Sequence, residues 1–264
     1  HSASFSENYR ADIYFKLENL QRTGSFKVRG ALNAILKNKE KCANGVITAS
    51  AGNHAQGVAF SAKLIGVKAV IVMPVHTPLV KINNTKSYGA EVVLHGDTYD
   101  DAATMAEILA EEKGLYLIHP FNNIDVIAGQ GTIAVEFLKE MQDADNIIIP
   151  VGGGGLASGI AAYLKECGSS AKIIGVQSEA VSGMAASLRK RRMVRVTGSS
   201  IIAEGISVKT PGDITYDICS KYLDDIVTVS ENIIAASILE YMEKAKLVVE
   251  GAGAAPLAAI MSRS

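Results

Sequence analysis

The sequence predicts an open, doubly wound α/β fold. Short runs rich in Val and Ile recur along the 264 residues, and most of them are apolar throughout, as strands buried on both faces of a parallel sheet must be. Longer amphipathic segments separate these runs. This alternation of strand and helix is typical of sheets covered by helices on both faces. With 48% apolar and 20% charged residues, the chain can bury the core of one large domain or two modest ones.

The elements follow from this alternation, taken in chain order. We predict strands over residues 13–17, 45–49, 69–74, 91–95, 116–119, 146–150, 172–177 and 226–229. Helical periodicity predicts helices over residues 54–64, 100–112, 126–141 and 156–165. Turns rich in glycine or small residues stand between strand and helix at 23–27, 50–54 and 152–155. Ligands of such folds bind at the carboxyl ends of the strands, so these turns are the candidate binding segments.

Composition and charge exclude several classes of function. The net charge is −1, and no stretch approaches the roughly 20 apolar residues that a membrane-spanning helix needs. The basic run at 189–192 is either a solvated helix end or a nucleic-acid patch, and the absence of Trp argues against base stacking. Three scattered cysteines fit a reducing compartment. We therefore expect a cytoplasmic protein, without a signal peptide at its start, that binds neither nucleic acid nor membranes.

Four successive glycines form the strongest single motif. Gly152, Gly153, Gly154 and Gly155 follow a predicted strand and precede the helix expected to begin near Leu156. Glycines let several backbone N–H groups converge, and the helix start adds a partial positive charge, which together suit a phosphate. The segment lacks the Lys of a Walker loop, and Gln177 stands where a Rossmann fold has an acidic residue. The alternative is a flexible turn.

Lys27 is the candidate nucleophile. It follows a turn, lies near a predicted helix start and is close to Arg29 in sequence, a setting that favours a neutral amine. A lone lysine is more often an exposed surface residue. A reactive lysine combined with a phosphate turn nevertheless indicates pyridoxal phosphate, whose aldehyde forms a Schiff base with a lysine.

A third turn offers polar groups at another helix start. Ser50 and Asn53 can cap this helix, and capping is the simplest explanation for them. Gly52 would leave backbone N–H groups free for a carboxylate, and Asn53 can donate a hydrogen bond to a phenolate oxygen. His54 is more readily explained as a structural histidine than as a base.

Together these segments resemble the serine/threonine dehydratase and serine racemase family. Residues 18–31 resemble its cofactor-lysine signature, residues 50–54 its asparagine loop and residues 152–155 its phosphate loop. Further matches lie at 128–132, 203–205 and 250–254. The likeness runs in order over essentially the whole chain and is strongest to the biodegradative threonine dehydratases.

The resemblance implies pyridoxal 5'-phosphate as cofactor and the so-called fold type II, in which two open, twisted, mostly parallel α/β domains are interleaved. A large domain would comprise residues 1–45 and 126–264, and a small inserted domain residues 46–125. The resemblance gives the site residues these roles: Lys27 as the catalytic and cofactor-carrying lysine; Phe26, Asn53, Gly152, Gly153, Gly154, Gly155, Leu156, Gly205 and Glu250 as cofactor-binding residues; Ser50, Gly52, Asn53 and His54 as substrate-binding residues.

The activity implied by the resemblance is the dehydration and deamination of L-threonine and L-serine, by β-elimination, to 2-oxobutyrate or pyruvate and ammonia. Ala51 stands where serine racemases carry a second serine, so we expect elimination rather than racemisation. Gln177 and Gly183 occupy the family's metal-ligand positions, so we expect no metal site. The likeness also suggests a homo-oligomer, a dimer or tetramer, and a chain that lacks both ends of the large domain. The alternatives are a serine racemase and, if the chain is truncated, a non-catalytic binder of this fold.

Overall fold

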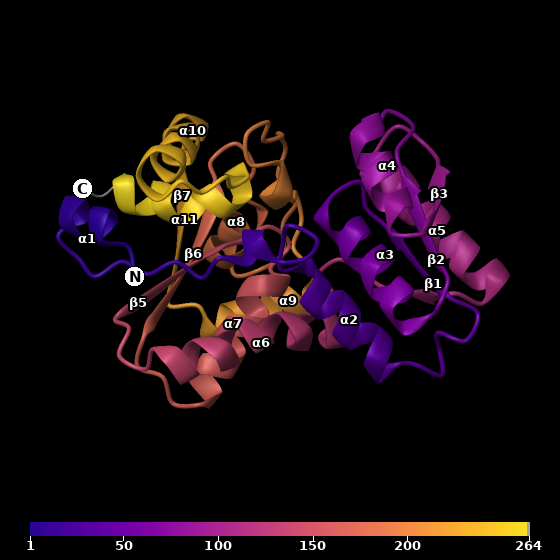
Figure 1. Cartoon of the computed structure of the whole chain (residues 1–264), viewed down its shortest axis with the longest axis horizontal. Coiled ribbons are helices and arrows are strands. Elements are labelled where there is room, and N and C mark those ends of the chain that lie inside the picture. Colours follow the sequence, from indigo (N-terminus) through magenta and orange to yellow (C-terminus); the bar gives the residue numbers. More distant parts are fainter. Residues whose placement is uncertain (263–264) are drawn as a thin grey trace. The chain divides into compact units, whose positions relative to one another are not determined.

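The computed structural model describes residues 1–262 and divides the chain into two compact units. Unit 1 comprises His1–Asn19 and the chain from Gly131 onward, and unit 2 comprises Leu20–Gln130. Each unit has its own parallel sheet with helices packed on it (Figure 1). The predicted α/β class with parallel sheets is confirmed. The predicted limits of the inserted domain, 46 and 125, stay a prediction.

Unit 2 is built on a four-stranded sheet in the order β3-β2-β1-β4, and all of its strand pairs are parallel. The strands are β1 (Val46–Ala49), β2 (Ala69–Met73), β3 (Glu91–Leu94) and β4 (Tyr116–Leu117). The helices wholly within this unit are α2 (Lys27–Lys37), α3 (Asn53–Ile65), α4 (Leu79–Ser87) and α5 (Tyr99–Lys113). Because the strands are parallel, all of their carboxyl ends lie at one edge of the sheet, where the turns into the helices begin.

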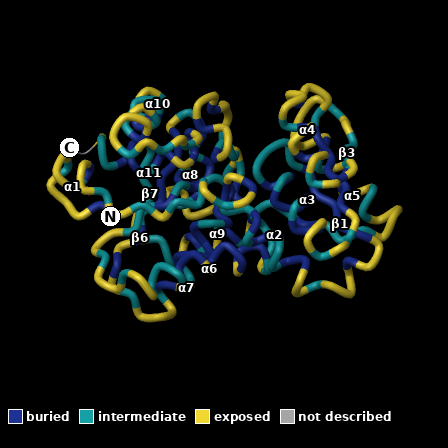
Figure 2. The backbone as a smooth tube through the Cα atoms, viewed as in Figure 1, coloured by how far each residue is buried: buried dark blue, intermediate teal, exposed yellow. Residues whose placement is uncertain are grey.

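Alternate side chains of the central strands bury two opposite faces. Val46 and Ile71 pack with apolar residues of α2 and α3, whereas Ile47 and Val70 pack with Ala102 and Ala106 of α5. Strands β1 and β2 are buried along their whole length (Figure 2). This two-sided burial explains why β1 and β2 are continuous apolar runs in the sequence rather than alternating ones.

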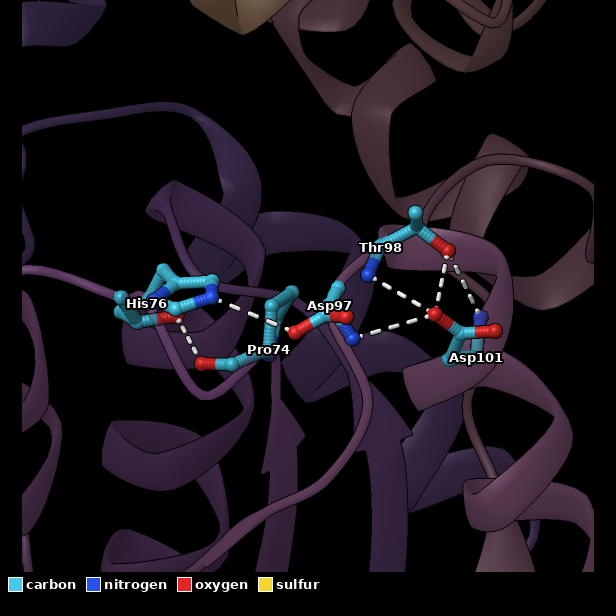
Figure 3. A network of polar contacts seen from close by, with 6 residues as sticks. Pro74, His76, Asp97, Thr98 and Asp101 are labelled. Atoms are coloured by element: carbon cyan, nitrogen blue, oxygen red, sulfur yellow. Dashed lines mark hydrogen bonds and ion pairs between the residues drawn. The ribbon is translucent and has the colours of Figure 1, made fainter.

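A polar network fixes the loop that enters α5 (Figure 3). The Asp101 carboxylate accepts the backbone N–H groups of Asp97, at 3.1 Å, and Thr98, at 2.9 Å. The Asp101 N–H in turn donates to Thr98 Oγ1 at 3.2 Å, which completes a capping box. The exposed His76 contacts Asp97 at 3.2 Å beside this network. The network is a structural cap and contains none of the predicted site residues.

Unit 1 is built on a three-stranded parallel sheet in the order β5-β6-β7. The strands are β5 (Asn146–Pro150), β6 (Lys172–Ser178) and β7 (Asp225–Val229). Its helices are α1 (Ala3–Tyr9), α7 (Gly155–Glu166), α8 (Gly183–Lys190), α9 (Asp213–Tyr222), α10 (Glu231–Glu240) and α11 (Gly251–Met261), together with the short η2 (Glu204–Ile206) and η3 (Tyr241–Ala245). The helix α6 (Ile124–Glu140) begins in unit 2 and ends in unit 1, and η1 (Glu18–Leu20) lies at the other boundary.

The helices predicted from periodicity match α3, α5, α6 and α7 within two residues at each end, whereas the strand predicted over residues 13–17 is wrong. This segment forms no strand. Its backbone bonds link it to the first helix: Ile13 N–H donates to Ser6 Oγ at 2.9 Å, and the Ile13 carbonyl accepts from Ser2 N–H at 2.9 Å. Two of its side chains instead pack into the core of unit 1, Ile13 buried and Phe15 partly buried.

An aromatic cluster attaches the amino-terminal segment to unit 1. The Phe5 side chain is fully buried, and its ring centroid lies 5.2 Å from that of Phe15 and 5.8 Å from that of Tyr241. Burial raises the pKa of the Tyr241 hydroxyl. Among residues 1–262, none of the helices is both long and apolar enough to cross a bilayer.

We predict that replacing Phe5 with alanine lowers the free energy of unfolding by about 3–5 kcal/mol, since the change leaves a cavity among aromatic rings. Urea denaturation followed by circular dichroism measures this loss. The matched control is Leu79→Ala, because the Leu79 side chain is 74% exposed, and it should change stability by no more than about 0.5 kcal/mol. A Phe5→Ala loss as small as that of the control would contradict the burial of this ring.

Candidate functional site

Lys27 is the first residue of α2, and its side-chain amine has a defined acceptor within unit 2. Its Nζ donates to the Pro120 carbonyl at 3.1 Å and lies 5.4 Å from the centroid of the Phe26 ring. The side chain is half-buried. Lys27 is therefore an oriented amine rather than a surface lysine extended into solvent.

The backbone of Lys27 is held by a close approach between α2 and α3. A Cβ atom at Gly57 would lie 3.0 Å from the Lys27 carbonyl carbon and 3.2 Å from its Cβ, so a side chain there would require the backbone to shift by a few tenths of an ångström. Gln130 fixes the same helix start from another side, since its Oε1 accepts the Gly30 N–H at 3.1 Å. The first turn of α2 has donors without an intrahelical acceptor, and Gln130 satisfies one of them.

The predicted substrate-binding residues lie together at the start of α3, directly after β1. Ser50 Oγ accepts the Gly52 N–H at 3.3 Å, and Gly52 is the residue that precedes the helix. A Cβ at Gly52 would meet no heavy atom within 4 Å, so open space adjoins it. Asn53 and His54 follow as the first two helical residues. Their backbone N–H groups have no intrahelical acceptor, and the helix start favours an anion.

His54 is buried and neutral. Its side chain donates from Nε2 to the Ile118 carbonyl at 3.1 Å, whereas Nδ1 is buried without a hydrogen-bond partner among residues 1–262. Burial, and then the nearby charge of Lys27, lowers the pKa of His54 to about 3. A neutral ring turned inward cannot pair with a carboxylate, so a contact between His54 and an anion would use its backbone N–H.

The glycine turn of unit 1 forms the amino-terminal end of α7. Gly154 has φ = +97°, in the left-handed region, and its Cβ would lie 2.7 Å from Met184 Cε. The Gly153 carbonyl accepts from Thr215 Oγ1 at 2.6 Å, and the Val151 carbonyl accepts from Gln177 Nε2 at 3.0 Å. With these carbonyls bound inside the unit, the turn has its N–H groups to offer an anion.

Gly205 and Glu250 lie beside this turn, although both are far from it in sequence. A Cβ at Gly152 would lie 3.4 Å from the Gly205 carbonyl oxygen and 3.1 Å from the Cα of Ile206. A Cβ at Gly205 would lie 3.3 Å from Glu250 Oε1. The structure therefore gathers the predicted cofactor-binding residues of unit 1 into one cluster, with Leu156 in the first turn of α7.

Gln177 has a structural role that the sequence did not indicate. Its fully buried amide accepts from the Ala185 N–H at 2.8 Å while donating to the Val151 carbonyl, so it connects β6, the glycine turn and α8.

Gly183, at the other predicted metal-ligand position, is packed against backbone, since a Cβ there would lie 2.6 Å from the Lys209 carbonyl oxygen. Within residues 1–262, His, Cys, Asp and Glu side chains form no group of three that could hold a metal ion. The expected absence of a metal site remains a prediction.

The structure thus forms two sets of predicted residues, one in each unit. Sequence reasoning missed the residues that hold them in place: Pro120, which accepts from Lys27, and Gln177 and Thr215, which hold the glycine turn. Pro120 follows β4, and the preference of ligands for the carboxyl ends of strands could have drawn attention to it. Thr215, within α9, gave no signal in the sequence.

The chain matches the profile of a protein family described as "Pyridoxal-phosphate dependent enzyme" over residues 1–264. It is 47% identical, over 264 residues, to an L-threonine ammonia-lyase from Thermotoga maritima, covering all of this chain and 66% of that protein. It is 48% identical, over 255 residues, to the L-threonine dehydratase catabolic TdcB from Staphylococcus aureus, covering 96% and 73%. The chain thus spans slightly under two thirds of the length of the Thermotoga protein.

Solved structures show the same similarity. The processed form of threonine deaminase isoform 2 from Solanum lycopersicum superimposes with a TM-score of 0.93 at 39% identity, covering 97% of this chain and 75% of that one. Maize serine racemase superimposes with a TM-score of 0.95 at 34% identity, covering 98% and 79%. Similarity of fold therefore extends to both dehydratases and racemases.

We predict that His54 makes the stability of the protein depend on pH. In the unfolded chain a histidine with the ordinary pKa of 6.5 takes up a proton below that pH, whereas His54 in the fold stays neutral down to about pH 3. The stability that depends on a neutral His54 is fully present above pH 6.5 and is lost progressively as the pH falls from 6.5 towards 3.

The measurement is the free energy of unfolding at pH 7.5 and pH 4.5, for the natural chain and for His54→Gln. The glutamine amide can still donate to the Ile118 carbonyl but takes up no proton. Two pH units below 6.5 correspond to about 2–3 kcal/mol, so the natural chain should lose about that much more than the variant. Equal losses in the two proteins would show that His54 is protonated in the fold.

Proposed function

The chain belongs to the family of pyridoxal-phosphate dependent enzymes. We propose that it eliminates water from L-threonine, and from L-serine, to release an enamine, which tautomerises and is hydrolysed by water to a 2-oxo acid and ammonia. The single observation that carries this proposal is the oriented amine of Lys27, held at 3.1 Å from the Pro120 carbonyl. The relatives named as threonine ammonia-lyase and threonine dehydratase support the choice of reaction.

The residues of the two sets fit the functional groups of pyridoxal phosphate. Its aldehyde requires a primary amine, which Lys27 provides, and its phosphate requires convergent N–H donors, which the glycine turn provides. Gly154 in particular cannot carry a side chain without strain, since its φ is +97° and a Cβ there would lie 2.9 Å from Thr215 Cβ. We propose that Gly152, Gly153, Gly154, Gly155 and Leu156 hold the phosphate.

The remaining predicted residues are proposed for the ring and the substrate. Asn53, at the start of α3, can donate to the hydroxyl oxygen of the ring, and Phe26 lies within reach of the Lys27 amine. Gly205 and Glu250 approach each other beside Gly152 and are proposed to line the ring. The substrate carboxylate is assigned to the start of α3, with Ser50, Gly52, Asn53 and His54, where backbone N–H groups favour an anion.

The cofactor, when bound, supplies a conjugated ring that accepts electrons from the α-carbon of the amino acid. Lys27 acts as the base that takes the α-proton on its Nζ. For this step its amine must be neutral and must be aimed at one position, since the rate depends on the distance between base and proton. The Pro120 carbonyl meets the second requirement, since it orients the amine.

Elimination is favoured over racemisation by one residue. Ala51 lies between Ser50 and Gly52 and carries a methyl group, which cannot give a proton to the second face of the substrate. A racemase would require a donor there.

A homo-oligomeric state and a cytoplasmic location also stay predictions. The cytoplasmic location is motivated by the free cysteines at positions 42, 167 and 219.

We predict that Lys27→Ala abolishes the visible absorption of the bound cofactor and lowers 2-oxobutyrate formation from L-threonine at least about 10²-fold, because the amine is the base of the reaction. The matched control is Lys37→Ala, which removes an exposed lysine from the last turn of the same helix and should keep both properties. Retention of absorbance and activity in Lys27→Ala would refute the assignment.

We predict that the natural chain forms pyruvate from L-serine with only background D-serine, and that Ala51→Ser raises D-serine formation at least about tenfold, a change of about 1.4 kcal/mol in the barrier. The added hydroxyl can donate a proton where the methyl cannot. Chiral chromatography of the products measures both outcomes. Substantial D-serine from the natural chain would instead identify a racemase.

A further inference from the structure

We propose that His119 is a positioning residue for Lys27, because it fixes the turn whose Pro120 carbonyl holds the lysine amine. The proposal deepens the proposed function and rests on it. The Lys27 amine donates at 3.1 Å to the Pro120 carbonyl, which is 93 residues away in sequence. Whatever fixes that carbonyl also fixes the amine.

The turn at Pro120 is organised by the His119 ring. His119 Nδ1 accepts the backbone N–H groups of Phe121, at 3.2 Å, and Asn122, at 2.8 Å. The His119 and Phe121 rings meet edge to face with centroids 4.6 Å apart. The His119 side chain thus holds the backbone of the next three residues in a turn. Pro120 is the first of these three residues, so its carbonyl belongs to the turn.

Residues on both sides of the turn are fixed as well. Before it, the Ile118 N–H donates to the Ile47 carbonyl of β1 at 2.9 Å, and the Ile118 carbonyl accepts from the buried His54. After it, Asn123 Oδ1 accepts the N–H groups of Asp125, at 2.9 Å, and Val126, which begin α6. Between these anchors, His119 supplies the side-chain bonds that shape the turn itself.

The topology explains why this turn meets Lys27. Strands β1 and β4 are parallel neighbours, so the Ser50–His54 segment after β1 and the turn after β4 leave the sheet at the same edge. Gly57 of α3 touches the backbone of Lys27, which brings that residue to this edge. The acceptor for the amine therefore comes from the strand next to the one that leads into α3.

The chemistry requires His119 to accept rather than donate at Nδ1. A ring nitrogen accepts hydrogen bonds through its lone pair, so a nitrogen that accepts two N–H groups carries no proton of its own. Alanine supplies no such acceptor. Asparagine does, because its side-chain oxygen can accept the N–H two residues further on and so support the same turn. His119→Ala and His119→Asn therefore separate loss of the acceptor from loss of the imidazole.

The experiment compares the natural chain, His119→Ala and His119→Asn, with His76→Ala as the matched control. His76 is an exposed histidine of the same unit whose contact is with Asp97. Circular dichroism melting first shows which variants are folded. Hydrogen exchange of the peptide that contains Phe121 and Asn122 then reports the turn. The rate at which added pyridoxal phosphate develops visible absorption reports the Lys27 amine, and kcat and KM for L-threonine are measured on the loaded proteins.

We expect faster exchange of this peptide in His119→Ala, at least about tenfold slower attachment of the cofactor and a kcat that falls about 10- to 100-fold with KM changed less, because a base misplaced by about 1 Å loses rate in this range. His119→Asn should recover most of each effect, and His76→Ala should match the natural chain. If His119→Ala is unfolded, the folded His119→Asn still tests the proposal by its amide exchange and attachment rate, which should both lie near those of the natural chain.

Two results would overturn the proposal. The first is a His119→Ala chain with natural attachment rate and kcat, whether or not its turn exchanges faster. The second is a His119→Asn chain that is folded, with a protected turn, yet as impaired as His119→Ala. Failure of the proposed function is distinguishable from both, since in that case the natural chain would itself develop no visible absorption with pyridoxal phosphate.

Discussion

The approach of α3 to the first residue of α2 is the constraint on which the lysine site depends. A side chain at Gly57 would push the two helices apart by a few tenths of an ångström, since its Cβ would lie 3.0 Å from the Lys27 carbonyl carbon. Interiors of proteins are packed too densely to absorb such a group without movement. This contact fixes the backbone of Lys27, and the Pro120 carbonyl then fixes its amine. Together they turn a flexible side chain into a directed one.

The anion site proposed for unit 1 depends on a different set of contacts. Glycines allow a turn to adopt many backbone conformations. This flexibility by itself does not orient the N–H groups of the turn toward a ligand. Here Thr215 and Gln177 bind the Gly153 and Val151 carbonyls from inside the unit, and this leaves the amide side of the turn available. The buried amide of Gln177 also bonds to Ala185, so the turn, a strand and a helix share one interaction.

In both units, segments with predicted site residues lie at the carboxyl ends of parallel strands. The Ser50–His54 segment, the Pro120 turn and the glycine turn follow β1, β4 and β5 at their carboxyl ends. The hydrogen bond from His54 to Ile118 shows one consequence: adjacent parallel strands bring together segments that are far apart in sequence. A neutral, buried histidine connects the two turns there. Burying a protonated, charged ring would cost free energy, so burial favours the neutral state of His54.

The sequence by itself determined the α/β class and the long central helices, and it supplied the residues proposed for the chemistry, because apolar periodicity and glycine-rich turns are local properties. It misjudged residues 13–17, where Ile13 and Phe15 pack into the core although the segment forms no strand. Only the tertiary structure decided that Gly205 lies beside Gly152 and Glu250 beside Gly205, and that the Pro120 carbonyl accepts from the Lys27 amine. These contacts join segments separated by tens of residues or more. Long-range packing creates them, and no pattern within one segment of the chain encodes the partner.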